Sequence, residues 1–332
     1  MKRLPFPLLW SAALLVVVLG LLLAACGGPV TPTLTPLPTA TPTPRSTPIP
    51  PVPTAIPLAT EDNPLVVLML PQGTRRAATN AADELETLIL ELSGLVVDVQ
   101  VVNSYGEIVA QLCGAAPVVG WVDGVSYVVA EAQACADPAL LVRRDEQRGF
   151  RVDVLASAEL VEGDLGDLAG EDFCRVDAED VVSWLVPSLM LYTAGVNPLY
   201  DLGEIIDVGD YDAVVAGIYN GECLAGAVPH DYLDEGLGEA LQDLEDLSER
   251  VVVLDTSLEF PYDILVYPQT VPLNVRIPLS DVFVQIAVDD ERASVLAAIL
   301  QQDELERVDR ADFSAFRNFM EQTGLNYAAL GE

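Results

Sequence analysis

Residues 65–70 read Leu-Val-Val-Leu-Met-Leu and end at the turn Pro-Gln-Gly-Thr of residues 71–74. A short continuous apolar run bounded by turn residues is typical of a strand that is buried on both faces of a parallel sheet. Beyond the turn, apolar residues recur at helical spacing from Ala81 to Leu92, and acidic residues occupy the opposite face. Gly94 stands where such a helix commonly ends. This stretch predicts the first strand and helix of an α/β fold.

The same alternation continues along the chain. Residues 95–102 alternate valine with polar residues like a half-buried strand, residues 105–113 have helical spacing, and residues 117–122 form a further apolar run. The resulting β-α-β-α-β order predicts an open, largely parallel sheet.

A second unit of strands and helices follows a basic loop with Arg143, Arg144 and Arg148. We expect strands at residues 152–155, 172–176, 223–228 and 251–254. We expect helices over residues 181–194, 212–220, 237–247, 279–300 and 311–322. The chain is thus predicted to form two α/β lobes, each a mostly parallel sheet flanked by helices. Lobe 1 takes residues 64–148 and 257–332, and lobe 2 takes residues 149–256, with connecting strands near residues 149–152 and 255–257.

The N-terminus has the layout of a bacterial lipoprotein signal over residues 1–25. Lys2 and Arg3 precede a short apolar stretch, and small residues lead directly to Cys26. Cleavage before Cys26 would leave a thiol that carries lipid and anchors the chain to the cell membrane. An uncleaved membrane span is the alternative, because residues 8–25 are apolar over about the 18 residues that a span needs. Both interpretations place the rest of the chain outside the cytoplasm.

Residues 26–63 combine the lipidated cysteine with a linker rich in threonine and proline. Proline fixes φ and lacks an N–H donor, and the segment has little to bury, so we expect it to be disordered and extended. At about 3.1 Å per residue, roughly 35 residues reach on the order of 100 Å, enough to lift a folded body away from a membrane.

The charge of the chain excludes one class of partner. Its 51 acidic residues face 16 basic ones, for a net charge of -35, and loss of Lys2 and Arg3 with the signal leaves 14 arginines and no lysine. Nucleic-acid binding needs a basic surface, so we expect no nucleic-acid partner. Such acidity also disfavours docking on anionic lipid, so attachment should depend on the lipid chain.

Four cysteines remain besides Cys26: Cys113, Cys135, Cys174 and Cys223. An even number outside the cytoplasm indicates disulfides, and four cysteines allow three pairings. Pairs Cys113–Cys135 and Cys174–Cys223 are favoured, because each would lie within one lobe; four buried free thiols are the alternative. A zinc site is disfavoured by the absence of a Cys-x-x-Cys spacing and by a single histidine, His230. We expect no metal and no cofactor.

Several stretches, each weak alone, occur in one order: Leu70-Pro71-Gln72, Gly120-Trp121-Val122-Asp123-Gly124-Val125-Ser126-Tyr127, Asp167-Leu168-Ala169-Gly170, Leu185-Val186-Pro187 and Ser257 to Asp263. Together they resemble the phosphate/phosphite/phosphonate type of ABC-transporter substrate-binding protein, which has the type II periplasmic binding protein fold. The similarity covers roughly residues 64–287. It implies a monomeric, extracytoplasmic protein that captures a small solute between two lobes and passes it to an ABC permease.

The chain departs from this family where the anion is held. Asp180-Val181-Val182-Ser183 stands where the family has Ser-Thr-Ser-Gly, and Tyr211 stands where it often has histidine. In the family, hydroxyls and N–H groups at that helix start bind the oxyanion. An aspartate there repels a dianion, and as an ordinary N-cap it occupies the donors. We therefore expect the usual phosphorus-oxyanion ligand to be lost.

Ten residues are predicted to bind the solute: Gln72, Tyr105, Asp123, Ser126, Tyr127, Asp180, Ser183, Tyr211, Tyr262 and Asp263. Trp121 and Trp184 are further candidates for aromatic walls. For each aromatic residue the alternative is core packing, and for Asp123 and Asp263 it is an ordinary turn. An acidic, aromatic cleft favours a polar organic solute that is neutral or cationic.

Two other functions stay open at this point. An exported hydrolase would need a base, and His230 is the only histidine available. The chain has no Gly-x-Ser-x-Gly elbow, phosphate loop or metal-binding helix motif, so we expect no enzyme. A sensor or scaffold of the same fold, without transport, is the second alternative.

Overall fold

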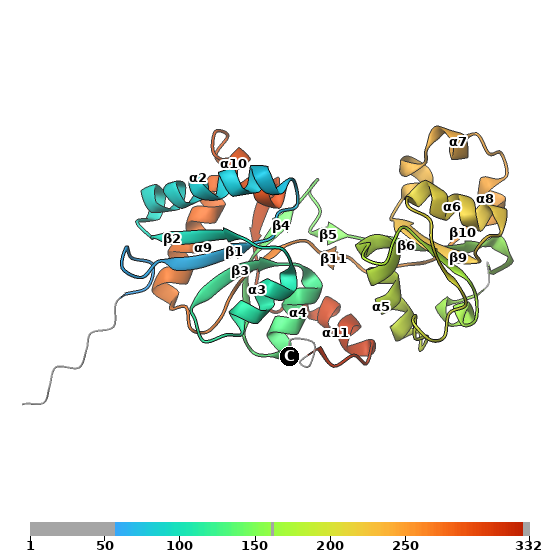
Figure 1. Cartoon of the computed structure of the whole chain (residues 1–332), viewed down its shortest axis with the longest axis horizontal. Helices are drawn as coiled ribbons and strands as arrows, with labels where there is room; N and C mark the ends of the chain where they lie inside the picture. The colour runs from blue at the N-terminus through green and yellow to red at the C-terminus, as the bar shows by residue number, and fades with distance from the viewer. Residues whose placement is uncertain (1–56, 161–162, 328–332) are drawn as a thin grey trace, which may run out of the picture. The chain divides into compact units, whose positions relative to one another are not determined.

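The apolar run of residues 65–70 is strand β1 (Leu65–Met69) in the computed structural model, which describes residues 57–160 and 163–327 (Figure 1). It pairs in parallel with β2 (Val97–Val101) on one side and with β3 (Val118–Val122) on the other. Helices α2 (Arg75–Ser93) and α3 (Tyr105–Leu112) make the connections, so the predicted β-α-β-α-β order is confirmed.

The predicted signal, Cys26 and the linker up to residue 56 lie outside the described residues. Among the residues that the structure describes, no helix is both long and apolar enough to cross a membrane. All described residues belong to one compact unit, Ala55–Glu332.

Lobe 1 is built on a six-stranded sheet with the order β13-β4-β12-β3-β1-β2. The strands β4 (Asp137–Arg143), β12 (Ile264–Tyr267) and β13 (Glu304–Arg307) pair antiparallel, so the sheet is more mixed than the sequence predicted. Two apolar clusters lie against its faces. One includes residues of α2, α9 (Leu273–Ala287) and α10 (Ala293–Leu300). The other includes residues of α3, α4 (Gly124–Ala132) and α11 (Ser314–Gln322), and it continues into lobe 2. Figure 1 shows α2 and α10 on one side of the strands and α3 and α4 on the other.

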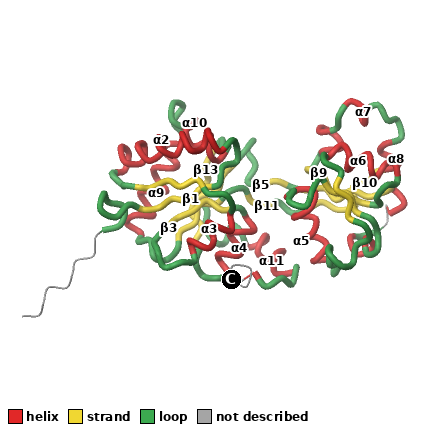
Figure 2. Tube along the Cα trace, viewed as in Figure 1, coloured by secondary structure: helices red, strands yellow, loops and turns green. Residues whose placement is uncertain are grey.

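Lobe 2 is built on a five-stranded sheet with the order β10-β6-β9-β7-β8. Its strands are β6 (Val152–Ser157), β7 (Phe173–Arg175), β8 (Ile205–Asp207), β9 (Ala225–Pro229) and β10 (Val251–Thr256). The strands β7, β8 and β9 are parallel, while β6 is antiparallel to both neighbours. Its helices are η1 (Ala158–Leu160), η2 (Leu165–Leu168), η3 (Val181–Leu185), α5 (Val186–Thr193), α6 (Tyr211–Asn220), η4 (Tyr232–Gly236), α7 (Glu239–Gln242) and α8 (Leu247–Arg250). In each lobe the strands lie between helices (Figure 2).

Two predicted helices are wrong as single elements. The helix expected over residues 237–247 is replaced by the short helices α7 and α8, and its start is lost because Gly238 is extended and α7 begins only at Glu239. The helix expected over residues 279–300 is two helices, α9 and α10. Between them the Asp289 side chain accepts the backbone N–H groups of Glu291 and Arg292, a local turn that competes with helix.

Both favoured disulfides are confirmed. Cys113 pairs with Cys135 within lobe 1, with 5.0 Å between the Cα atoms, and Cys174 pairs with Cys223 within lobe 2, with 5.8 Å. The second cystine is buried in the core of lobe 2.

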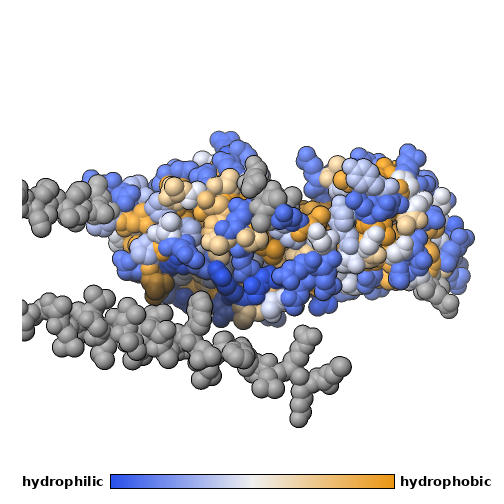
Figure 3. Space-filling view, turned by 90° about the horizontal axis from the view of Figure 1, so that it is seen from below, coloured by the Kyte–Doolittle hydropathy of each residue, from blue (hydrophilic) through white to orange (hydrophobic). Residues whose placement is uncertain are grey.

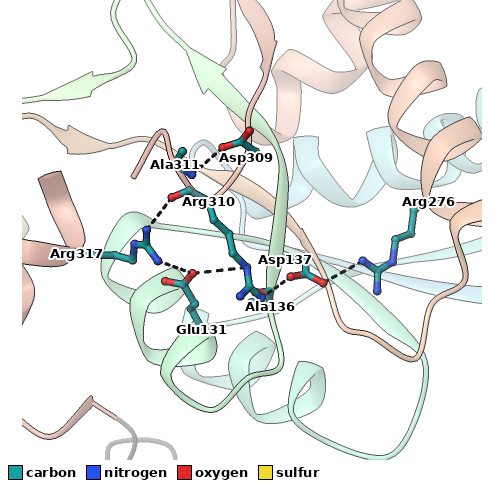
Figure 4. A network of polar contacts seen from close by, with 8 residues as sticks. All are labelled: Glu131, Ala136, Asp137, Arg276, Asp309, Arg310, Ala311 and Arg317. Carbon is teal, nitrogen blue, oxygen red and sulfur yellow. Dashed lines mark hydrogen bonds and ion pairs between the residues drawn. The ribbon is translucent and has the colours of Figure 1, made fainter. Parts of the chain in front are cut away.

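Several arginines form ion pairs that connect different elements of lobe 1 (Figure 4). Arg317 on α11 contacts Glu131 on α4 at 3.1 Å, and Arg276 on α9 contacts Asp137 on β4 at 3.1 Å. Arg310 bridges both carboxylates. Glu131 is mostly buried, so this network holds α11 against lobe 1 more firmly than exposed pairs would.

Hydrophilic side chains cover much of the face shown in Figure 3.

The two lobes are connected through a pair of two-residue strands. β5 (Gly149–Phe150) pairs antiparallel with β11 (Phe260–Pro261). The rings of Phe316 and Phe319 on α11 lie 5.1 and 5.7 Å from the Phe260 ring. A Cβ atom at Gly149 would stand 2.1 Å from the Phe260 carbonyl oxygen, so this close pairing requires glycine.

Candidate functional site

A cavity of about 250 Å³ lies where both lobes and both connecting strands meet. Its lining residues are Gln72, Tyr105, Asp123, Gly124, Val125, Arg144, Phe150, Val181, Val182, Leu185, Val186, Phe260, Pro261, Tyr262 and Asp263. Lobe 1 and the connecting strands contribute the polar and aromatic residues, whereas lobe 2 contributes only valines and a leucine. We call this cavity the interlobe pocket.

Asp263 is the most enclosed charged group of the pocket, with 3% of its surface exposed. The Tyr105 hydroxyl donates to Oδ1 at 2.6 Å, and Arg144 Nη2 lies 3.0 Å from Oδ2. Gln72 Nε2 donates to the Tyr105 hydroxyl at 2.6 Å and reaches Asp263 Oδ1 at 3.4 Å. Burial raises the pKa of Asp263 to about 6, against the opposing effects of Tyr105 and Arg144.

Arg144 is held in place by three partners. Besides Asp263, its Nη2 donates to the Leu300 carbonyl oxygen at 2.9 Å. Its guanidinium carbon lies 4.4 Å from the centre of the Tyr262 ring, a cation–π contact. The positive charge of Arg144 is therefore already paired within the protein.

Asp123 begins helix α4 as its N-cap, and its Oδ1 accepts the Ser126 N–H at 2.7 Å. Burial raises the pKa of Asp123. Burial and the charges of Asp263 and Asp123 also raise the pKa of Tyr105, so its hydroxyl stays protonated and donates. In the part of the chain that the structure describes, no arginine or histidine forms an ion pair with Asp123.

The wall from lobe 2 begins one residue after Asp180. Asp180 caps η3, and its Oδ1 accepts the Ser183 N–H at 2.5 Å. The Tyr211 hydroxyl donates to Asp180 Oδ2 at 3.2 Å. The Ser183 hydroxyl accepts the Val176 N–H at 2.9 Å and is fully buried. The Ser183 N–H and the Tyr211 hydroxyl are thus bound by the protein's own carboxylate.

The structure separates the ten predicted residues into two groups. Gln72, Tyr105, Asp123, Tyr262 and Asp263 line the interlobe pocket. Residues outside its lining are Ser126, Tyr127, Asp180, Ser183 and Tyr211, although Ser126, Asp180 and Ser183 belong to the caps beside it.

Three aromatic candidates lie elsewhere. Trp121 is buried in the core of lobe 1, with its ring 5.5 Å from that of Phe283. Tyr127 is buried against Phe313. Trp184 lies under the Arg175 guanidinium. Core packing explains the first two.

Sequence reasoning did not nominate Arg144, Phe150, Phe260, Pro261 or the four aliphatic residues of lobe 2 as lining residues. Arg144 had a weak signal, a basic loop in an acidic chain. Phe260 and Pro261 lie inside a stretch that resembled the family, but that stretch drew attention only to its polar members.

His230 lies outside this pocket, beside a larger cavity of lobe 2. Its Nδ1 contacts the buried Asp153 at 2.9 Å, and its Nε2 lies 3.5 Å from Asp231. Thr256 also donates to Asp153, at 2.7 Å. Asp153 on β6 therefore joins His230 after β9 and Thr256 at the end of β10.

A cavity between two α/β lobes and their connecting strands is a common place for a ligand site. The family model of the ABC-transporter phosphonate periplasmic substrate-binding protein matches residues 67–313. The chain belongs to this family.

Solved structures agree with this fold. A binding-protein component of an ABC phosphonate transporter from Pseudomonas aeruginosa is 15% identical, covers 79% of this chain and 88% of its own, and has a TM-score of 0.50. A Xanthomonas citri protein bound to chloride ion is 14% identical, covers 78% and 97%, and has a TM-score of 0.57. The same protein bound to ATP is 14% identical, covers 78% of this chain and 96% of its own, and has a TM-score of 0.57. Identities this low show a shared fold only. No curated protein sequence matches the chain.

Proposed function

We propose that this chain is a lipid-anchored solute-binding protein that captures a small organic solute in the interlobe pocket for an ABC importer. The observation that carries the proposal is the lining of that pocket, which combines residues of both lobes and both connecting strands. A solute that contacts both lobes stabilises their closed arrangement, and a permease then recognises that arrangement. The protein acts as a monomer, without a cofactor and without catalysis.

The solute is not a phosphorus oxyanion. Helices α4 and η3 begin at the pocket, and each is capped by an aspartate, Asp123 and Asp180. The N–H groups of Ser126 and Ser183 are bound to these carboxylates at 2.7 and 2.5 Å. These N–H groups would therefore not be free to bind an incoming dianion, and the two carboxylates would repel it.

The direct test is native mass spectrometry of freshly purified protein, which detects a small molecule that remains bound. Distances between spin labels on the two lobes then show whether that molecule closes them. We expect a bound solute and a shorter distance after its addition. A methylphosphonate that binds tightly and closes the lobes would overturn the exclusion of oxyanions.

A pair of variants ties the solute to the pocket. Leu185→Glu places a charge on the aliphatic wall and should abolish retention of the solute. Leu199→Glu is the matched control, because Leu199 is an exposed leucine of lobe 2 outside the pocket lining. Equal loss in both variants, or retention in both, would contradict binding in this pocket.

A further inference from the structure

The chemical class of the solute can be argued from the charges and walls of the interlobe pocket, on the basis of the solute capture proposed above. Its lining holds two carboxylates, Asp123 and Asp263, and one cation, Arg144. Arg144 is paired with Asp263 at 3.0 Å and also donates to Leu300. Within the described residues no cation pairs with Asp123, so the polar end of the pocket lacks one positive charge.

Asp123 is partly exposed to the pocket, and a carboxylate that a solute would cover loses hydration at a cost unless a counter-charge replaces it. The Ser126 N–H satisfies one oxygen of Asp123, Oδ1, at 2.7 Å. An ammonium group would supply the missing charge together with N–H donors in one contact. A neutral hydroxyl would supply a donor without the charge.

The opposite wall sets a second requirement. Lobe 2 contributes Val181, Val182, Leu185 and Val186 to the lining and no polar side chain. Val181 and Leu185 remain 41% and 36% exposed, which leaves apolar surface for a solute to cover. Phe150 and Phe260 add aromatic surface from the connecting strands. A charged group without an apolar body would leave this surface uncovered.

We propose that the interlobe pocket takes an organic primary amine whose ammonium group contacts Asp123 and whose apolar body lies on Val181, Val182 and Leu185. The cavity of about 250 Å³ limits its size. At about 30 Å³ for each water-sized group, it holds roughly eight such groups, which limits the solute to a small molecule. This class differs from phosphonates in charge and in the wall that recognises it.

Isothermal titration calorimetry of the full chain with three probes tests both requirements. Phenethylamine has the amine and the body, 2-phenylethanol has the body alone, and ethylamine has the amine alone. We expect phenethylamine to bind about tenfold or more tightly than either of the others, as one charge-assisted contact and one buried ring would give. Equal affinity for 2-phenylethanol, or no binding of phenethylamine, overturns the amine assignment.

Asp123→Asn keeps the size of the side chain and a capping oxygen while it removes the charge. It should weaken phenethylamine about tenfold and change 2-phenylethanol by less than about twofold. Asp210→Asn is the matched control, because Asp210 caps α6 with an equal 2.7 Å contact to Ala213 and lies outside the pocket lining. An unchanged affinity for phenethylamine in Asp123→Asn overturns the assignment, and melting curves of both variants verify folding.

Different experimental results would overturn the amine assignment and the proposed solute capture. A solute that lacks an amine but closes the lobes would overturn the amine class and leave solute capture intact. Failure of every solute, including any that co-purifies, to close the lobes would overturn solute capture itself.

Discussion

Aspartates take two different positions around the interlobe pocket. Asp123 and Asp180 each cap the start of a helix and accept the backbone N–H of its third residue. Asp263 instead lies on the return segment, where Arg144 and Tyr105 hold it from two other parts of lobe 1. The same residue type thus blocks anion donors at two sites and orders the polar end of the pocket at a third.

Asp263 gives the protein a pH dependence of defined sign. Its pKa is about 6 in the folded chain, above the ordinary value of 3.8. As the pH falls from 7 through 6 toward 4, the folded state takes up this proton before the unfolded state does. The contribution of Asp263 to stability therefore rises as the pH falls. At about 1.4 kcal/mol per pKa unit, the full span is about 3 kcal/mol.

Urea denaturation of the wild type and of Asp263→Asn at several pH values between 4 and 7.5 measures this contribution. Carboxylates away from Asp263 titrate alike in both chains and cancel in the difference, whereas Asp123 interacts electrostatically with Asp263. We expect the wild type to gain stability relative to the variant toward low pH. A difference that stays constant or changes in the opposite direction would contradict the assignment.

Individual residues of the pocket were easier to predict than their contacts. Asp263 and Tyr105 were nominated, but they are 158 positions apart, and nothing local indicates that they share a hydrogen bond. Arg144 was recognised only as part of a basic loop. The aliphatic wall was missed because valines and leucines in an α/β chain are first assigned to the core.

Elements were predicted well where periodicity and end signals agreed. β1 to β3 with α2 and α3 follow the sequence pattern closely, and Gly94 ends α2 at φ 72°. The added antiparallel strands β12 and β13 escaped detection because they are four residues long and their pairing partner, β4, is far away in sequence. Short strands of this kind depend on tertiary pairing more than on local pattern.

The strand pair β5–β11 supports a prediction at this scale. Gly149→Ala would place a methyl group against the Phe260 carbonyl, at an ideal distance of 2.1 Å. Because backbone atoms must shift, we expect a loss of about 1–3 kcal/mol in unfolding free energy. Gly106→Ala in α3 is the control, since its nearest neighbour is 3.8 Å away and alanine favours helix. Thermal unfolding compares the stability of the two variants. Equal stability would show that Gly149 does not need to be glycine for the β5–β11 pairing.

The two disulfides should stabilise their lobes unequally. Cys174–Cys223 closes a loop of 49 residues, and Cys113–Cys135 closes one of 22. Loop entropy gives about 4 kcal/mol for the first and about 3 kcal/mol for the second. Paired Cys→Ala variants, compared by urea denaturation, should show the larger loss in lobe 2, where the cystine is also buried. A larger loss from Cys113→Ala/Cys135→Ala would refute this order.

At the scale of the whole molecule, the proposed lipid anchor rests on Cys26 alone. We expect radioactive palmitate fed to expressing bacteria to label the full chain, and Cys26→Ser to abolish both the label and cleavage of the signal. An unlabelled wild-type chain that still sediments with membranes would favour the uncleaved span instead.

The chain passes between the lobes at two adjacent places. Ser257 donates its backbone N–H to the Val152 carbonyl oxygen at 2.8 Å, and its hydroxyl accepts the Val152 N–H at 2.9 Å. The intervening segment therefore departs from and rejoins the rest of the fold at one spot, as inserted domains commonly do. Recombination between relatives could exchange that segment as a cassette, so that one half of the binding surface evolves while the half nearest the tether is inherited unchanged.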